Sequence, residues 1–304
     1  MKVCLLFILL SLPALAESQK RNTIKADVVV IGGGTGGTAA AIQSARLGAK
    51  TILAEPGYML GGMLTAAGVS CTDGNDQLPS GMWDEFRQAL YKHYGKKNLN
   101  TGWVSNTCFE PHVGDSIFKS WAGKEKKLTV LFGHTFMNVH KAGNKVTGVS
   151  IADKEGEIIR IDAKVVIDAT ETGDVLAASG AAYDLGMDDP AITNEREARE
   201  KNNIIQDLTW AAILKDYGPG NDKTIARPPD YDSSKYFCST ADAPCASKPY
   251  IYNTKKVLDY GKLPRSPGAL LDKYMLNWPA HGNDYYLNVV EQSVTDRNKS
   301  YKLA

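Results

Sequence analysis

Residues 26–37 read ADVVVIGGGTGG, an apolar and largely β-branched run that is followed at once by glycines. A short continuous apolar run is typical of a strand that is buried on both faces of a parallel sheet. Residues 38–47, TAAAIQSARL, contain strong helix formers and end before Gly48, and residues 50–55, KTILAE, form a second apolar strand. Residues 26–55 therefore predict one βαβ unit with a right-handed crossover.

The glycines between the predicted strand and helix have the spacing GxGxxG, at Gly32, Gly34 and Gly37. The first allows a tight turn, the second lets the backbone approach a pyrophosphate, and the third lets the helix pack on the strand. The helix N-terminus then presents free amides and a partial positive charge to the phosphate. Glu55 ends the second strand 18 residues after Gly37, where a carboxylate can accept hydrogen bonds from ribose hydroxyls. These features predict a dinucleotide site.

The rest of the chain predicts an α/β fold, in which a Rossmann-like parallel sheet carries an antiparallel β-meander and an incomplete α+β substrate domain follows. Helices are expected at about 81–94 and 111–125. The turn residues between apolar runs predict meander strands, followed by a further buried parallel strand, at 128–132, 135–140, 146–151, 158–161 and 164–169. Residues 205–217 fit a strand or a helix, and residues 219–249 are expected to form a long loop.

Three later motifs stand out, and the first two, together with the predicted meander, favour FAD over NAD as the dinucleotide. They read LGGMLT at 60–65, IDATETGD at 167–174 and NWPAHGND at 277–284. The glycine doublet and the ATETGD turn, together with the meander, are similar to the FAD-binding fold of the glutathione reductase type. With VIGGGTGG at 30–37, the chain from Asp27 onward resembles the secreted bacterial FAD-dependent oxidoreductase family.

This resemblance implies a role for each glycine turn and a division of the chain into domains. The residues expected to meet the FAD pyrophosphate are Gly32, Gly34, Thr35, Gly36 and Gly37. Glu55 would bind the adenosine ribose, Phe136 lies where the fold offers backbone groups to the adenine, and the flavin side would contact Gly61, Gly62, Met63 and Thr65. The FAD-binding domain is expected at 24–80 and 126–182, a helical insertion at 81–125 and a substrate or cap domain at 183–304.

The resemblance also implies an oxidoreductase in which the flavin accepts hydride from, or donates it to, a small organic substrate. The candidate catalytic residues are His281, Asn283 and Asp284. A histidine can act as acid or base near neutral pH, and the two short polar side chains can contact the substrate. The alternative for these three residues is a hydrogen-bonded turn, to which Gly-Asn-Asp is suited. Two other functions remain open: a non-catalytic fragment with a nucleotide half-site, and an NAD-binding dehydrogenase.

Proteins of the resembled fold close the cofactor site with a late segment, commonly a Gly-Asp pair followed by a helix. No stretch after Asp174 matches it, and residues 291–304 have the composition of a polar helix start. We therefore expect the chain to be the N-terminal portion of a longer protein, with an open flavin half-site.

The first 16 residues, MKVCLLFILLSLPALA, combine a positive residue, an apolar middle and a small-x-small end. This pattern is typical of a secretory signal peptide cleaved after Ala16, which predicts a secreted or periplasmic protein. The alternative is a membrane anchor, but an apolar segment of about 10 to 14 residues is shorter than the roughly 20 that span a bilayer. After cleavage we expect no stable membrane insertion.

The charge balance argues against a polyanionic partner. The chain has 35 basic and 34 acidic residues, and no block of like charge stands out. A nucleic-acid-binding protein would show a basic patch or stripe. We therefore expect a small-molecule substrate and no nucleic acid.

The cysteines left after signal cleavage allow three pairings among Cys71, Cys108, Cys238 and Cys245. Cys238 and Cys245 lie seven residues apart and could staple a loop, but spacing alone does not decide the pairing. Cys71 is either a thiol near the flavin or a small packed residue, and no second cysteine is near enough in sequence for a vicinal dithiol. The histidines and cysteines show no metal-ligand spacing, so no metal site is predicted.

Overall fold

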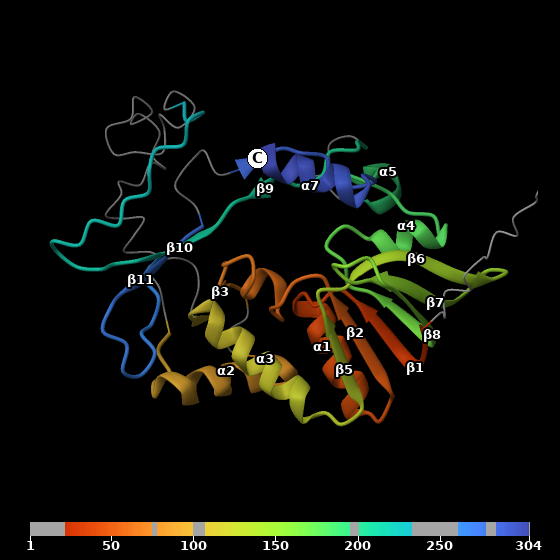
Figure 1. Ribbon diagram of the computed structural model, residues 1–304, viewed down its shortest axis with the longest axis horizontal. Coiled ribbons are helices and arrows are strands. Elements are labelled where there is room, and N and C mark those ends of the chain that lie inside the picture. The colour runs from red at the N-terminus through yellow and green to blue at the C-terminus, as the bar shows by residue number, and fades with distance from the viewer. Residues whose placement is uncertain are drawn as a thin grey trace, which may run out of the picture.

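The computed structural model describes residues 22–74, 78–99, 107–194, 201–232, 261–277 and 284–303. The predicted signal peptide at 1–16 and the two cysteines at 238 and 245 lie outside the described residues. Figure 1 shows a central sheet with helices α1, α2 and α3 beside it and the later part of the chain above its upper end.

The central sheet has six strands in the order β5, β2, β1, β8, β7, β6. Their bounds are β5 Leu128–Phe132, β2 Thr51–Glu55, β1 Asn22–Ile31, β8 Ile158–Asp168, β7 Lys145–Ala152 and β6 Thr135–Ala142. The first four strands run parallel to one another, whereas β7 pairs antiparallel with both β8 and β6. Helix α1 (Thr35–Arg46) connects β1 to β2, which confirms the predicted βαβ unit and the α/β fold.

Two details of the predicted meander are wrong. The strand at 128–132 is parallel and lies at the sheet edge beside β2, so the antiparallel part contains β6, β7 and β8. The segments 158–161 and 164–169 are one strand, because Asp162 and Ala163 pair with Lys25 and Ala26 of β1. Asp162 interrupts the apolar pattern in the sequence, but β1 and β7 both pair with the strand at this residue.

The last three residues of β1 and the first four of β2 are buried, so these two strands are covered on both faces, as their continuous apolar runs predict. Along β1, Val30 joins a core cluster on one face, while Val29 and Ile31 join a second cluster on the other. The first cluster includes side chains of α1, α2 (Gly81–Tyr94) and α3 (Pro111–Lys124). The second includes residues of β6 and β7, so the meander covers the opposite face of the parallel strands.

The helices α2 and α3 occupy the predicted ranges within one residue. Because they share a core cluster with α1 and with the sheet, the predicted helical insertion packs directly on the central sheet. A short strand pair, β3 (Cys71–Thr72) with β4 (Thr107–Cys108), flanks α2 in the sequence.

The later part of the chain contains short elements. These are α4 (Asp174–Ser179), α5 (Pro190–Thr193), β9 (Leu208–Thr209), β10 (Ala212–Lys215), β11 (Lys273–Leu276), β12 (Asp284–Tyr285) and α7 (Val294–Leu303). Strand β10 pairs with β11 and β9 pairs with β12, so the segment at 205–217 contains strands and no helix. Within the described ranges, none of the helices combines the length and apolar character needed to cross a membrane.

Candidate functional site

The predicted glycine turn follows β1 and leads into α1. Gly32 has φ of 97°, and a Cβ there would overlap the carbonyl of Ala169, so the position requires glycine. Gly34 is the N-cap of α1, no side chain caps the helix, and its first turn contains no acidic residue. A Cβ added at Gly36 would meet no atom within 4 Å. Thr35 and Gly36 are exposed, so the first turn of α1 is open to an anion.

Glu55 lies at the end of β2, beside the glycine turn. One carboxylate oxygen accepts from the amide of Gly33 at 2.6 Å and the other accepts from the amide of Gly57 at 2.6 Å. The carboxylate therefore stabilises the glycine turn at Gly33 and the turn at Gly57, in addition to any contact with a ligand. Each carboxylate oxygen keeps a second acceptor position, which a ribose hydroxyl can use.

The glycine doublet packs against the first glycine turn. The Gly61 amide donates to the Gly33 carbonyl at 2.8 Å, and the Thr35 hydroxyl donates to the Gly61 carbonyl at 2.8 Å. Gly61 and Gly62 both have positive φ, and the doublet leads into the 3₁₀ turn η1 (Gly62–Leu64). The structure thus brings together the two motifs that the sequence separates.

The two other residues predicted for the flavin side differ in exposure. Thr65 is buried and its hydroxyl donates to the Leu60 carbonyl at 2.7 Å, so its side chain stabilises the turn. Met63 is 60% exposed at the end of the same turn. Of these two, only Met63 has a side chain that is free to contact a ligand.

The pattern analysis missed Glu171, which belongs to the turn after β8. A Cβ at Gly34 would lie 2.7 Å from its Oε1 atom, and a Cβ at Gly62 would lie 3.3 Å from the same atom. The Glu171 carboxylate thus lies against both glycine turns. Its position in the ATETGD motif was the available signal, because the turns after adjacent parallel strands meet at one edge of a sheet.

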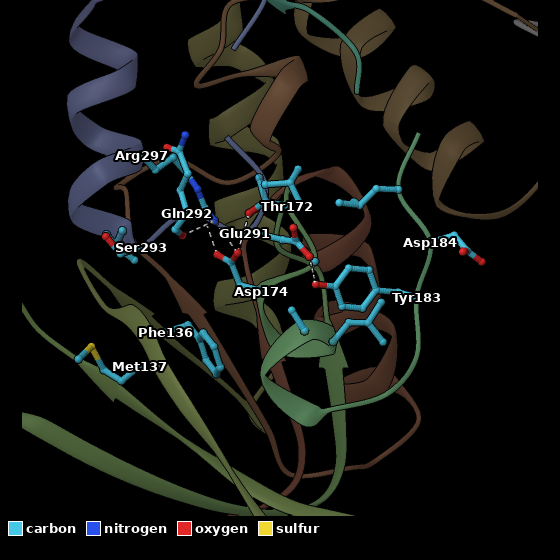
Figure 2. Close-up of a pocket in the computed structure, with 16 residues that line it drawn as sticks. Phe136, Met137, Thr172, Asp174, Tyr183, Asp184, Glu291, Gln292, Ser293 and Arg297 are labelled. Atoms are coloured by element: carbon cyan, nitrogen blue, oxygen red, sulfur yellow. Dashed lines mark hydrogen bonds and ion pairs between the residues drawn. The ribbon is translucent and has the colours of Figure 1, made fainter. Parts of the chain in front are cut away.

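A cavity of about 560 Å³ lies between α4, β6 and the segment that leads into α7 (Figure 2). Phe136 and Met137 line it from β6, and Thr172 and Asp174 line it from the turn and helix after β8. Phe136, the residue predicted to lie near the adenine, therefore faces a cavity large enough for a ring system.

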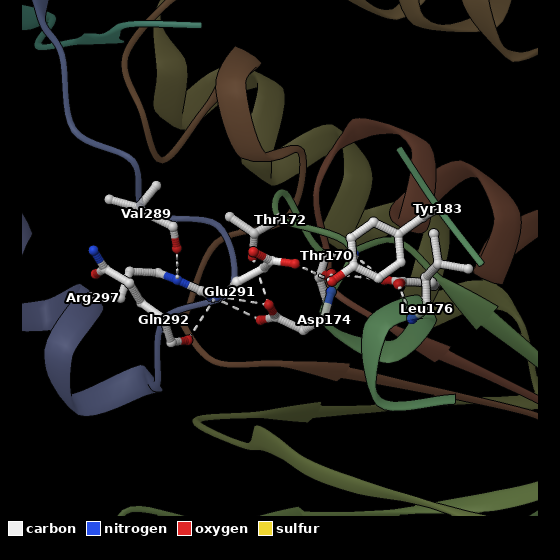
Figure 3. A network of polar contacts seen from close by, with 10 residues as sticks. Thr170, Thr172, Asp174, Leu176, Tyr183, Val289, Glu291, Gln292 and Arg297 are labelled. Atoms are coloured by element: carbon white, nitrogen blue, oxygen red, sulfur yellow. Dashed lines mark hydrogen bonds and ion pairs between the residues drawn. The ribbon is translucent and has the colours of Figure 1, made fainter. Parts of the chain in front are cut away.

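A polar network closes one side of this cavity (Figure 3). The Arg297 guanidinium of α7 donates to both carboxylate oxygens of Asp174 at 2.8 Å, and the Thr172 hydroxyl donates to the same carboxylate at 2.8 Å. The hydrogen bonds from Arg297 lower the pKa of Asp174 below its usual range. The Tyr183 hydroxyl donates to Glu291 at 2.6 Å. The late helix is thereby tied to the turn after β8.

These residues fit the pyrophosphate and ribose of a dinucleotide. The fit rests on the uncapped N-terminus of α1, the open space at Gly36 and the free acceptor positions of Glu55. The Glu171 carboxylate also lies against the turn, but Glu171 is exposed to solvent.

Two of the three predicted catalytic residues have no described position, so their role stays a prediction. His281 and Asn283 lie outside the described residues, and Asp284 is placed by its backbone in β12, where it pairs with Thr209. Within the parts of the chain that are described, no group of three or more His, Cys, Asp or Glu side chains is arranged to hold a metal ion.

Comparison with known proteins gives one family and several partial relatives. A family model described as FAD dependent oxidoreductase matches residues 27–304. The chain is similar to the mitochondrial dihydrolipoyl dehydrogenase of Mus musculus, at 32% identity over 157 residues, which cover 48% of this chain and 28% of that protein. It is 54% identical over 50 residues to the enzyme of the same name from Caenorhabditis elegans, covering 16% of this chain and 10% of that protein. The chain spans less than a third of the length of these relatives.

Solved structures match about half of the chain. A geranylgeranyl bacteriochlorophyll reductase-like protein from Thermoplasma acidophilum has a TM-score of 0.42 at 22% identity, covering 52% of this chain and 43% of that one. The myxobacterial chondrochloren halogenase, described as FAD-dependent, has a TM-score of 0.38 at 17% identity, covering 49% and 38%.

Proposed function

Since the chain belongs to the FAD dependent oxidoreductase family, we propose that its two glycine turns and Glu55 hold FAD at the carboxyl ends of β1 and β2. The observation that carries the proposal is the contact between the two turns, in which Gly61 bonds to Gly33 beside the uncapped N-terminus of α1. Each turn alone is a common loop. Together they place the glycine doublet directly beside the first turn of α1.

In this arrangement the pyrophosphate lies over Gly34 and Gly36 and accepts hydrogen bonds from the first amides of α1. The ribose hydroxyls donate to the outer acceptor positions of Glu55. Phe136 supports the adenine at the cavity between β6 and α4, and Met63 flanks the flavin end.

When bound, FAD supplies hydride transfer to or from a small organic substrate. This chain's residues bind and orient the cofactor, and the contact between the two glycine turns keeps its phosphates in register with the flavin end. For the substrate side we retain the motif at 277–284, with His281 as the candidate acid or base and Asn283 and Asp284 as polar contacts. The signal-like first 16 residues favour export of the protein.

The test is to titrate the Gly34→Ala variant with FAD and to monitor binding by flavin fluorescence. The added methyl enters the space of the pyrophosphate, so we expect the Kd for FAD to rise at least tenfold, about 1.4 kcal/mol. In the absence of FAD the methyl meets only the end of the Glu171 side chain, so the fold should tolerate it.

Gly123→Ala in α3 is the matched control, because its new methyl meets no atom within 4 Å. It should leave the Kd for FAD unchanged. Thermal unfolding of both variants shows whether each is folded. A folded Gly34→Ala protein with unchanged FAD affinity would contradict the proposed position of the cofactor.

A further inference from the structure

The strand pair β3 and β4 places two cysteines opposite each other. Cys71 and Cys108 are direct partners in the antiparallel register, and both are buried thiols in the structure. Leu263 and Met275, from the later part of the chain, belong to the same buried cluster. The partner that the sequence spacing did not reveal for Cys71 is therefore Cys108, on the other side of α2.

The register brings the two side chains as close as a sheet allows. The amide of Phe109 donates to the carbonyl of Ser70 at 3.0 Å, so these residues form a hydrogen-bonded pair. The adjacent pair, Cys71 and Cys108, is therefore a non-hydrogen-bonded pair, in which Cα atoms face each other at about 4.5 Å. Disulfides join Cα atoms that lie about 4.4 to 6.8 Å apart. The backbone is thus already within bonding range.

The two strands continue into opposite sides of the glycine-doublet turn. On the β3 side, the amide of Val69 donates to the carbonyl of Met63 at 3.0 Å. On the β4 side the chain enters α3, where Asp115 accepts from the amide of Leu60 at 2.9 Å. A covalent link between the strands would hold together the two segments that frame this turn.

We propose that Cys71 and Cys108 are oxidised to a disulfide that ties the glycine-doublet turn to the start of α3. The oxidant is a small-molecule or protein disulfide, as found in oxidising compartments. Each cysteine loses its thiol proton, one S–S bond forms between them, and the S–S bond of the oxidant breaks and takes up two electrons and two protons. The proposal is independent of the flavin chemistry.

The bond forms while the chain folds. Cys108 is fully buried and Cys71 is 8% exposed, so a disulfide oxidant does not reach them once β11 covers the pair. The neighbouring thiol of Cys71 and burial both raise the pKa of Cys108, which leaves little thiolate to react in the native state.

The experiment maps the cysteines of the full chain after refolding with reduced and oxidised glutathione. Free thiols are blocked with iodoacetamide, and the unreduced protein is digested with trypsin. Cys71 lies in the peptide 51–87, Cys108 in 98–119, and Cys238 and Cys245 share the peptide 236–255. We expect peptides 51–87 and 98–119 to be joined, with a mass two hydrogen atoms below their sum.

Variants separate this bridge from other pairings. The joined peptide should persist in Cys238→Ser/Cys245→Ser, and in Cys71→Ser the Cys108 peptide should carry the alkyl label. Reductant should lower the Tm of the wild type and leave that of Cys71→Ser/Cys108→Ser unchanged. Alkyl label on both Cys71 and Cys108 in folded, unreduced wild type, or a link from either to Cys238 or Cys245, would overturn the proposal.

Discussion

Strands β1 and β8 are parallel neighbours that end side by side, with Ile31 opposite Asp168, yet the turns after them are built from opposite chemistry. After β1 the chain turns through glycines and leaves the first amides of α1 without a side-chain acceptor. After β8, Asp168 accepts from the amide and hydroxyl of Thr170 and from the amide of Leu176.

The difference shows how two turns at one edge of a sheet can have separate roles, one suited to binding an anion and the other to holding α7. The glycine turn keeps its donors free, so it attracts an anion. The turn after β8, residues 168–174, is called the acidic turn. Its own carboxylate at Asp168 accepts hydrogen bonds from nearby backbone amides. Its negative charge also forms an ion pair with Arg297 of α7 through Asp174. Under the proposed FAD position, one turn thus faces the ligand and the other holds the later part of the chain.

The largest effect is expected where the two turns touch. A carbon added at Gly37 would lie 2.7 Å from the Ala169 methyl and would overlap the Gly32 carbonyl. Gly37→Val forces the backbone of both turns to move, so the free energy of unfolding should fall by about 3 kcal/mol or more. Urea denaturation measures this loss.

The control is Gly36→Ala in the same turn, where the new methyl meets no atom within 4 Å. Its unfolding midpoint should match or slightly exceed that of the wild type, because alanine favours the helix. If Gly37→Val also unfolded at the wild-type midpoint, the contact between the turns would contribute nothing to stability.

The glycine turn was predictable from sequence because its determinants are local. The apolar run of β1, the glycine spacing and the helix formers of α1 all lie within 30 consecutive residues. The boundaries of α2 and α3 followed from helical periodicity for the same reason.

The contacts between the acidic turn and α7 were not predictable, because they join residues far apart in the chain. Asp174 and Arg297 are separated by 123 residues, and Cys108 reaches Cys71 only through strand pairing. The edge position of β5 likewise depends on which strand lies beside β2. Periodicity describes which face of an element is buried, but it does not identify the neighbour.

A smaller effect is expected on removing the anchor of the acidic turn. Arg297→Met keeps most of the apolar stem and leaves the partly buried Asp174 carboxylate without its cation. The free energy of unfolding at pH 7 should fall by about 1 to 2 kcal/mol, less than for a fully buried pair. Lys299→Met, in the same helix but paired with the exposed Asp296, should change it by less than about 0.5 kcal/mol.

The pH dependence distinguishes the ion pair from packing. Arg297 lowers the pKa of Asp174 in the folded protein, so the pair stabilises the fold above the unfolded carboxyl pKa of about 3.9. That stabilisation is lost as the pH falls through the folded pKa. The difference between wild type and Arg297→Met should therefore shrink in acid, and a difference that stays constant from pH 7 to pH 3 would indicate lost packing alone.

The smallest effect is expected where the acidic turn reaches the ligand side. The carboxylate of Glu171 lies against Gly34 and Gly62, so under the proposed FAD position it repels the pyrophosphate. Glu171→Gln removes this charge, and the Kd for FAD should fall about three- to tenfold at low ionic strength, at most about 1.4 kcal/mol. Since salt screens exposed charges, the gain should shrink as salt is added. Glu155→Gln, in the β7–β8 turn, is the control and should not change the Kd. A weaker affinity of Glu171→Gln for FAD would instead show that this carboxylate accepts hydrogen bonds from the cofactor, and both turns would then bind it.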